Sequence, residues 1–204
     1  MAENNQNLEE KVKELTRIKG EVRGVAFKTD MEFILKEKGE EGLKKLEIEL
    51  EKAGFPINYK AIKAMDFYPV GLRVISLLII KKTFNFDDKQ IKDMGVFAAK
   101  VSLIIKLFVK YFFSTQRVFF KEAPKMWDKH YTISKLIPIE LDEEKKYAIL
   151  QIEDLVLDSI FCNYLGGYFC SILQMVVSTN KIDFQETKCP FHGDKYHEYL
   201  LKWQ

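Results

Sequence analysis

The spacing of apolar residues changes once along this chain, near Tyr131, and this change restricts the fold class more than any other feature. Before it, apolar residues recur every three or four positions, as in amphipathic helices. After it, they alternate with polar residues, as in half-buried strands. The sequence therefore predicts an α+β fold, with an N-terminal helical layer packed on an antiparallel sheet.

Local signals divide the first part into helices. Thr29 and Glu32 form a capping box that would open a long helix. Pro69 suits the first turn of another helix, and Pro124 would kink or split a third. Five helices are expected, over residues 29–52, 59–65, 70–82, 88–113 and 116–129.

Domain organisation follows from length and from the N-terminal pattern. A chain of 204 residues is long enough for one domain with its own core. Residues 1–19 carry an apolar helical stripe on a charged segment and predict an N-terminal helical arm that packs on a partner chain. Residues 20–204 then form a single domain whose first element is a short strand. Its helical part is expected at about residues 29–130 and its sheet part at about residues 131–204.

The sheet part has the order hairpin, helix, hairpin. An acidic turn joins the two strands of the first hairpin, and a turn at Gly193 and Asp194 joins those of the second. The expected strands are residues 133–141, 146–152, 182–189 and 195–203, with a helix over residues 154–177.

Composition excludes several classes of protein. The net charge is +2 and 28 of the 32 basic residues are lysine, whereas arginine is the residue that forks onto phosphate and guanine. No nucleic-acid partner is expected. The N-terminus lacks the apolar region of a signal peptide, and Lys100, Lys106 and Lys110 interrupt the longest apolar stretch, so no membrane span is expected. We therefore expect a cytoplasmic protein, in which three cysteines argue against disulfides.

Cysteine and histidine are rare, yet several of them lie close together near the C-terminus. Cys189 and His197 would meet across the second hairpin, with Glu186 on the same strand as Cys189. Cys162 lies on the helix that must pack against this sheet. These four residues could bind zinc tetrahedrally, because zinc accepts thiolate, imidazole and carboxylate ligands. His192, at C-x-x-H spacing, is the substitute ligand.

The alternative explanation is that these residues bind no metal. Free cysteine often fills a hydrophobic core, and a histidine near a hairpin is commonly a surface polar group. One C-x-x-H pair is also a weaker signal than two intact C-x-x-C pairs. Spacing alone leaves both explanations open.

Residues 154–203 resemble a known family. The run F-C-N-Y-L-G-G-Y-F-C at 161–170, followed by Glu186-x-x-Cys189, Gly193-Asp194 and His197-x-Tyr199, is similar to the 4-vinyl-reductase domain. That domain is related to the ligand sensors of phenol-responsive activators, to haem-NO-binding domains and to vesicle-tethering subunits. The resemblance implies a zinc-containing domain that binds small molecules.

The resemblance also implies a ligand set. In the phenol sensors a helix cysteine, a Glu-x-x-Cys pair and a further cysteine eight residues on bind zinc. The matching positions here are Cys162, Glu186, Cys189 and His197. This chain departs from the pattern at His197, where the sensors have cysteine, and at Cys170, where the family usually has a small residue. Cys170 is then a buried thiol outside the ligand set.

Aromatic residues point to a small-molecule site. Sixteen Phe and nine Tyr in one domain can line an apolar chamber between helices and sheet, although ordinary core is the commoner explanation for any one of them. The chamber candidates are Phe97, Phe108, Phe112, Phe119, Trp127 and Tyr131. We therefore expect non-catalytic binding or sensing of a small hydrophobic molecule, supported by a structural zinc. Any signal would pass through a homodimer or a separate signalling protein.

Other functions were weighed against this one. A haem sensor needs an axial ligand, and His130 lies at a helix end, where a solvated or capping histidine is commoner. The Tyr-x-Ser-x-Arg motif of haem-NO-binding domains is absent, so no haem is expected. Reduction of a tetrapyrrole vinyl group would need a hydride source, yet no G-x-G-x-x-G follows a strand. A tethering or membrane-surface scaffold would use the basic helices at 73–82 and 100–110, but a solvent-facing edge explains their lysines.

Overall fold

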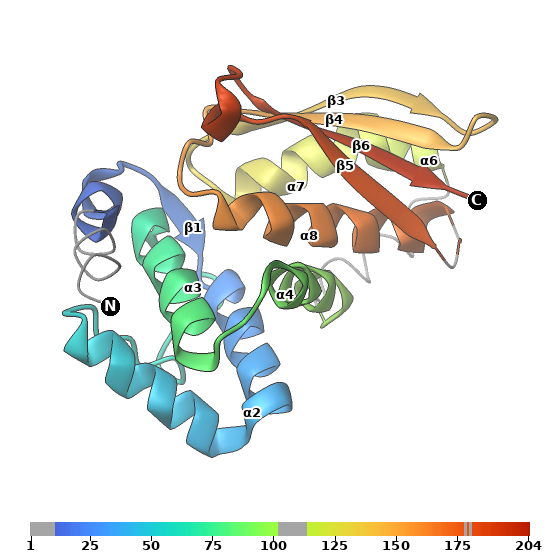
Figure 1. Ribbon diagram of the computed structural model, residues 1–204. Coiled ribbons are helices and arrows are strands. Elements are labelled where there is room, and N and C mark those ends of the chain that lie inside the picture. The colour runs from blue at the N-terminus through green and yellow to red at the C-terminus, as the bar shows by residue number, and fades with distance from the viewer. Residues whose placement is uncertain (1–10, 102–113, 178, 180) are drawn as a thin grey trace. The chain divides into compact units, whose positions relative to one another are not determined.

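The computed structural model describes residues 11–101, 114–177, 179 and 181–204. The chain divides into two compact units, Met1–Phe86 and Asp87–Gln204 (Figure 1). The first is mainly helical, and the second combines helices with a four-stranded antiparallel sheet. The predicted α+β class is confirmed. The division into a 1–19 arm and a 20–204 domain stays a prediction.

The described part of the first unit is helical apart from a two-stranded ribbon and its connecting turns. Strands β1 (Glu21–Arg23) and β2 (Phe67–Pro69) pair antiparallel, and helices α2 (Val25–Lys52) and α3 (Val70–Phe84) follow them along the chain. Residues 11–17 are also helical, and residues 59–65 form turns rather than the expected helix.

Helix α2 begins before the predicted capping box. Thr29 lies inside its second turn, where the hydroxyl donates to the carbonyl of Ala26 at 2.9 Å and caps nothing. The helix starts at Val25 because Gly24 N–H and Val25 N–H are both satisfied by carbonyls of the 64–66 turn. It is kinked at Gly39, where φ is 70°.

The N-terminal arm packs within its own unit. Leu15 is buried, and a Cβ added at Gly71 of α3 would lie 2.0 Å from the Leu15 carbonyl oxygen. The described part of the arm therefore uses its apolar stripe inside this chain. A homodimer stays a prediction.

The second unit has the predicted order of hairpin, helix and hairpin. Its helices are α4 (Asp88–Val101), α6 (Thr115–Arg117), the π-helical turn η1 (Val118–Glu122), α7 (Ala123–His130) and α8 (Ile160–Val177). Its strands are β3 (Lys135–Asp142), β4 (Tyr147–Glu153), β5 (Ile182–Lys188) and β6 (His197–Trp203), with the short 3-10 helix η2 (Pro190–His192) between the last two. The sheet order is β3-β4-β6-β5.

One face of this sheet is covered by α7 and α8 (Figure 1). Along β4 the residues alternate, and Ala148, Leu150 and Ile152 are the buried ones. Helix α8 starts at Ile160, later than expected, because the Asp158 carboxylate accepts the Ile160 N–H at 2.8 Å. This start places Cys162 in the first turn of the helix, facing the end of the sheet.

Helix α8 also packs closely on α4. A Cβ added at Gly95 would lie 1.9 Å from the Tyr164 carbonyl oxygen, and one at Gly167 would lie 2.2 Å from that of Lys92. By length and composition α8 could cross a membrane, and it is the one such helix in the described part of the chain. Its contacts with α4 and β5 instead make it the core helix of this unit.

Candidate metal centre

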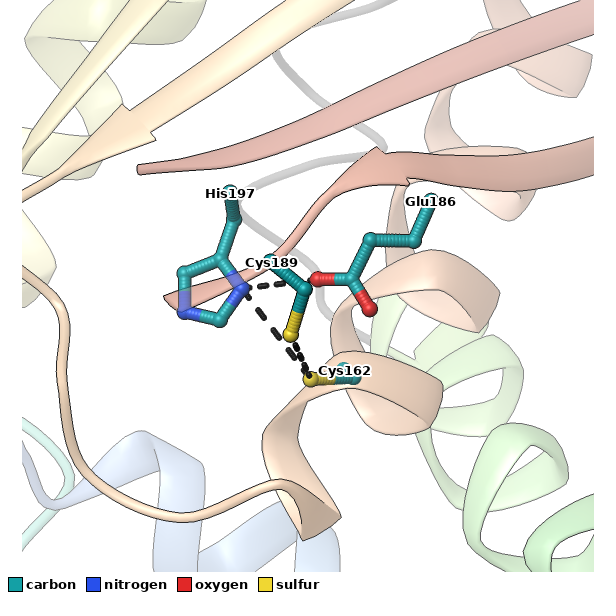
Figure 2. Close-up of side chains that lie close together, drawn as sticks. All are labelled: Cys162, Glu186, Cys189 and His197. Carbon is teal, nitrogen blue, oxygen red and sulfur yellow. Dashed lines mark hydrogen bonds and ion pairs between the residues drawn. The ribbon is translucent and has the colours of Figure 1, made fainter. Parts of the chain in front are cut away.

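Four side chains from three elements converge beside the first turn of α8 (Figure 2). Cys162 comes from α8, Glu186 from β5, Cys189 from the residue after β5, and His197 from the start of β6. Their candidate ligand atoms all lie within 4.8 Å of one another. The structure thus brings together the four residues singled out in the sequence, and their binding of a metal stays a prediction.

A β-bulge puts Glu186 and Cys189 on the same side of the sheet. Side chains three apart on a regular strand point to opposite faces. Here the register between β5 and β6 shifts between Glu186, which pairs with Tyr199, and Lys188, which pairs with Glu198. The extra residue reverses the alternation, so both donors face α8.

The histidine ring is fixed by bonds to both of its nitrogens. His197 is buried, and its Nε2 lies 2.8 Å from the carbonyl oxygen of Leu155, which can only accept. Nε2–H therefore donates to that carbonyl. Nδ1 lies 2.7 Å from Glu186 Oε1 and 4.0 Å from Cys162 Sγ.

The sulfur atoms complete a set of electron-pair donors. Cys162 Sγ and Cys189 Sγ are 3.7 Å apart, and both residues are buried. Burial, and then the negative charge of Glu186, raises the pKa of the Cys162 thiol far above its usual range. A carboxylate, an imidazole nitrogen and two sulfurs therefore face one another. A metal ion that displaced the thiol protons could be bound by the same four groups.

Two other candidate residues lie outside this group. His192 is exposed on η2 and is absent from the four converging side chains. Cys170 is buried farther along α8, where desolvation raises its pKa to about 11. Its position agrees with the expected role of a buried thiol.

The chamber candidates are spread over several elements. Trp127 and Tyr131 stack with ring centroids 4.5 Å apart, and Phe119 is buried nearby on η1. Phe97 is half-buried on α4. Phe108 and Phe112 lie outside the described residues. The apolar chamber itself stays a prediction.

Sequence reasoning missed two members of the aromatic cluster beneath the sheet. Phe169 of α8 lies 6.2 Å from Trp127 and 5.5 Å from Tyr199 of β6, measured between ring centroids. Tyr199 in turn stacks on His197 at 6.4 Å. The alternation along β6 could have placed Tyr199 on the inner face beside His197, two residues away.

No family model and no curated protein sequence matches the chain. Solved structures do match. An H-NOX (haem-NO-binding) protein from S. oneidensis in the Fe(II)NO ligation state superposes with a TM-score of 0.67 at 12% identity, covering 89% of this chain and 99% of that one. Unliganded Fe(II) H-NOX from K. algicida superposes with a TM-score of 0.61 at 10% identity, covering 89% of this chain and 96% of that one.

The chain has the H-NOX fold. The resemblance to the 4-vinyl-reductase domain is contradicted, since the matching structures are H-NOX domains. The vinyl-reductase alternative likewise finds no support. The motif misled because its few Cys, Glu and Gly positions determine one side-chain cluster and one turn. They do not determine the rest of a fold that several families share.

The cofactor prediction of a structural zinc and no haem is also contradicted. The solved structures with this fold are described by their Fe(II) ligation states and, in one case, by the redox potential of their haem. The error arose from treating the absence of a short motif as the absence of a haem protein. At identities of 10–13% such motifs need not persist.

The three histidines of the sequence differ in their surroundings. The Nδ1–H of His130 donates to the carbonyl of Met126, one turn earlier in α7, at 2.8 Å. His197 uses both ring nitrogens in the cluster, and His192 is exposed.

Proposed function

We propose that the protein is a non-catalytic sensor domain that binds a small molecule. The observation that carries this proposal is the match of its fold, over 89% of the chain, to H-NOX proteins solved with NO on Fe(II). The identity of 12% limits that match to the fold. The chain's own residues must therefore supply the rest of the argument.

Helix α7 and the residue after it provide the groups for such a site. His130 would hold haem iron, with its Nδ1–H bonded to the Met126 carbonyl. Bound haem would supply an iron that binds a small gas molecule reversibly. Trp127 and Tyr131 stack on each other, and Trp127 Nε1–H donates to Ser134 Oγ at 3.0 Å.

Haem titration tests this proposal. Wild-type protein is expected to bind haem with a sharp Soret band that shifts when NO is added. His130→Gly should lose that band and recover it with added imidazole. His192→Gly, which removes an exposed histidine, is the matched control and should behave as wild type. Protein that binds neither haem nor a co-purifying apolar molecule, as judged by native mass spectrometry, would refute the sensor proposal.

A second proposal concerns the cluster, because a separate observation favours it. We infer that Cys162, Glu186, Cys189 and His197 bind a transition-metal ion, whose identity the experiment must determine. Metal–sulfur bonds of about 2.3 Å in a tetrahedral site place the two sulfurs about 3.8 Å apart. The observed separation is 3.7 Å. Four protein ligands leave no open position, so the ion would be structural and would tie α8 to the second hairpin.

Native mass spectrometry of the purified protein measures the ion directly. One metal ion per chain is expected, and a chelator should remove it. Cys189→Ser should lose both the ion and thermal stability, whereas Cys170→Ser should keep both, because Cys170 lies outside the cluster. Wild-type protein that is metal-free, with an unchanged melting temperature after metal is added, would exclude a metal centre here.

A further inference from the structure

The turn that carries Cys189 closes back on that residue. Cys189 is followed by η2 and by Gly193, whose φ of 97° is a conformation that glycine adopts readily. The carbonyl of Cys189 accepts the N–H groups of His192 at 2.9 Å and of Asp194 at 3.2 Å. The carbonyl of Cys189 is therefore held by the last residues of the turn that follows it.

The other side of the Cys189 backbone is held by a side chain. Its N–H donates to Asp194 Oδ2 at 2.9 Å. The pairing of β5 with β6 ends one residue earlier, at Lys188, so this N–H lies beyond the strand ladder. Asp194 thus bonds Cys189 twice, through its carboxylate and through its own N–H.

We propose that Asp194 is a positioning residue of the metal centre, an inference that rests on the metal site proposed above. It touches no candidate ligand atom and acts through the backbone of Cys189. By fixing that backbone at φ −148° and ψ 126°, it directs Sγ toward Cys162 and His197. The bulge at Glu186 brings Cys189 to the correct face, and Asp194 keeps it there.

A cobalt titration of the full chain tests this role. Asp194→Ala should weaken Co²⁺ binding by about 10–100-fold, the usual effect of removing a group that orients a ligand. Asp194→Asn should recover most of the affinity, because its amide oxygen can accept the same N–H. Asp183→Ala is the matched control: Asp183 is also exposed and lies on β5 of the second hairpin, but its carboxylate faces Lys181 Nζ at 3.4 Å.

The cobalt absorption spectrum separates positioning from simple stability. Asp194→Ala should change the cobalt–thiolate bands at saturating Co²⁺, because one sulfur is misplaced, while the metal-free variant melts close to metal-free wild type. If Asp194→Ala binds within twofold of wild type with the same spectrum, or if Asp194→Asn recovers nothing, the inference is overturned and the metal centre stands. Wild-type protein that takes up no Co²⁺ would overturn both.

Discussion

Each unit of this protein contains a buried polar cluster, and the two clusters differ in the groups that they bring together. In the first unit Asp30 of α2 faces Arg73 of α3, with Arg73 Nε 3.2 Å from Asp30 Oδ2, and Tyr59 bonds Ser76. In this cluster the Asp30 carboxylate pairs with the Arg73 guanidinium, and the two hydroxyls share a hydrogen bond. In the second unit the four converging groups are all electron-pair donors.

This difference separates a structural cluster from the proposed binding site. Donors and acceptors that match one another need nothing further, and they select one packing of two helices. Converging sulfur, nitrogen and carboxylate donors can bind a cation, which displaces the thiol protons. The first cluster is complete within the chain, and the second is the one proposed to hold an ion. The following experiments test that distinction, from the largest expected effect to the smallest.

Breaking the ion pair of the first unit should have the largest effect. Asp30→Ala leaves the Arg73 guanidinium buried without its carboxylate, which costs about 3–5 kcal/mol of unfolding free energy. Both side chains are at most 2% exposed. Urea unfolding followed by circular dichroism measures the loss. The double variant Asp30→Leu with Arg73→Met should recover most of it, and a single variant that loses under 1 kcal/mol would contradict a paired charge.

Removing the ion from the second unit should have the next largest effect. At a free-ion concentration 100 times the dissociation constant, binding stabilises the folded state by about 2.7 kcal/mol. Both tryptophans, Trp127 and Trp203, belong to the second unit. A chelator should therefore lower the melting temperature seen by tryptophan fluorescence. A transition that does not move with chelator would show that the four donors are stable without a cation.

Deleting one hydroxyl of the first cluster should have a smaller effect. Tyr59→Phe leaves the buried Ser76 hydroxyl without this partner, at a cost of about 1–3 kcal/mol. Burial raises the pKa of Tyr59 far above its usual value, so its hydroxyl stays protonated at neutral pH. Tyr147→Phe is the control. That residue is on the outer face of the sheet, with a pKa raised to about 12 by its bond to Glu140. Equal melting temperatures for the two variants would contradict the expected difference.

Alkylation of Cys170, the cysteine outside the cluster, should give the smallest effect. With its pKa at about 11, Cys170 is thiolate in roughly one molecule per thousand at pH 8. At pH values below this pKa the side chain is mainly thiol, and only the thiolate reacts. The alkylation rate should therefore rise about tenfold per pH unit between pH 8 and about 11. Peptide mapping after iodoacetamide treatment measures this rate. Rapid labelling of native protein at pH 8 would show that Cys170 is more exposed than its position on α8 implies.

Much of the second unit could be predicted from sequence because its signals are local. The change from helical to alternating spacing located the sheet, and the four donors emerged from the scarcity of Cys and His. The reversal at the bulge could not be foreseen, since Gln185, Glu186 and Thr187 look like a regular strand. The start of α2 was also missed, because backbone carbonyls from the 64–66 turn cap it and no side chain signals this.

The sequence reached the H-NOX fold only indirectly, through a family that is related to haem-NO-binding domains. A motif of conspicuous residues directed the search toward one family, while the match to H-NOX structures depends on the course of the backbone over 89% of the chain. Identities near 12% mean that this backbone is compatible with very different side chains. Packing positions such as Gly95 and Gly167 show why, because they require only the absence of a Cβ and carry no family-specific chemistry.

The bulge in β5 sets which spacings of Glu186 and Cys189 keep both side chains on one face. With two residues between them, they share a face only because the bulge adds one residue to the strand. Deleting Thr187 would remove the bulge and leave the two donors two apart on a regular strand, again on one face. A regular strand that kept both intervening residues would instead separate the donors. Chains that keep the site should therefore have either two intervening residues with a bulge or one without it.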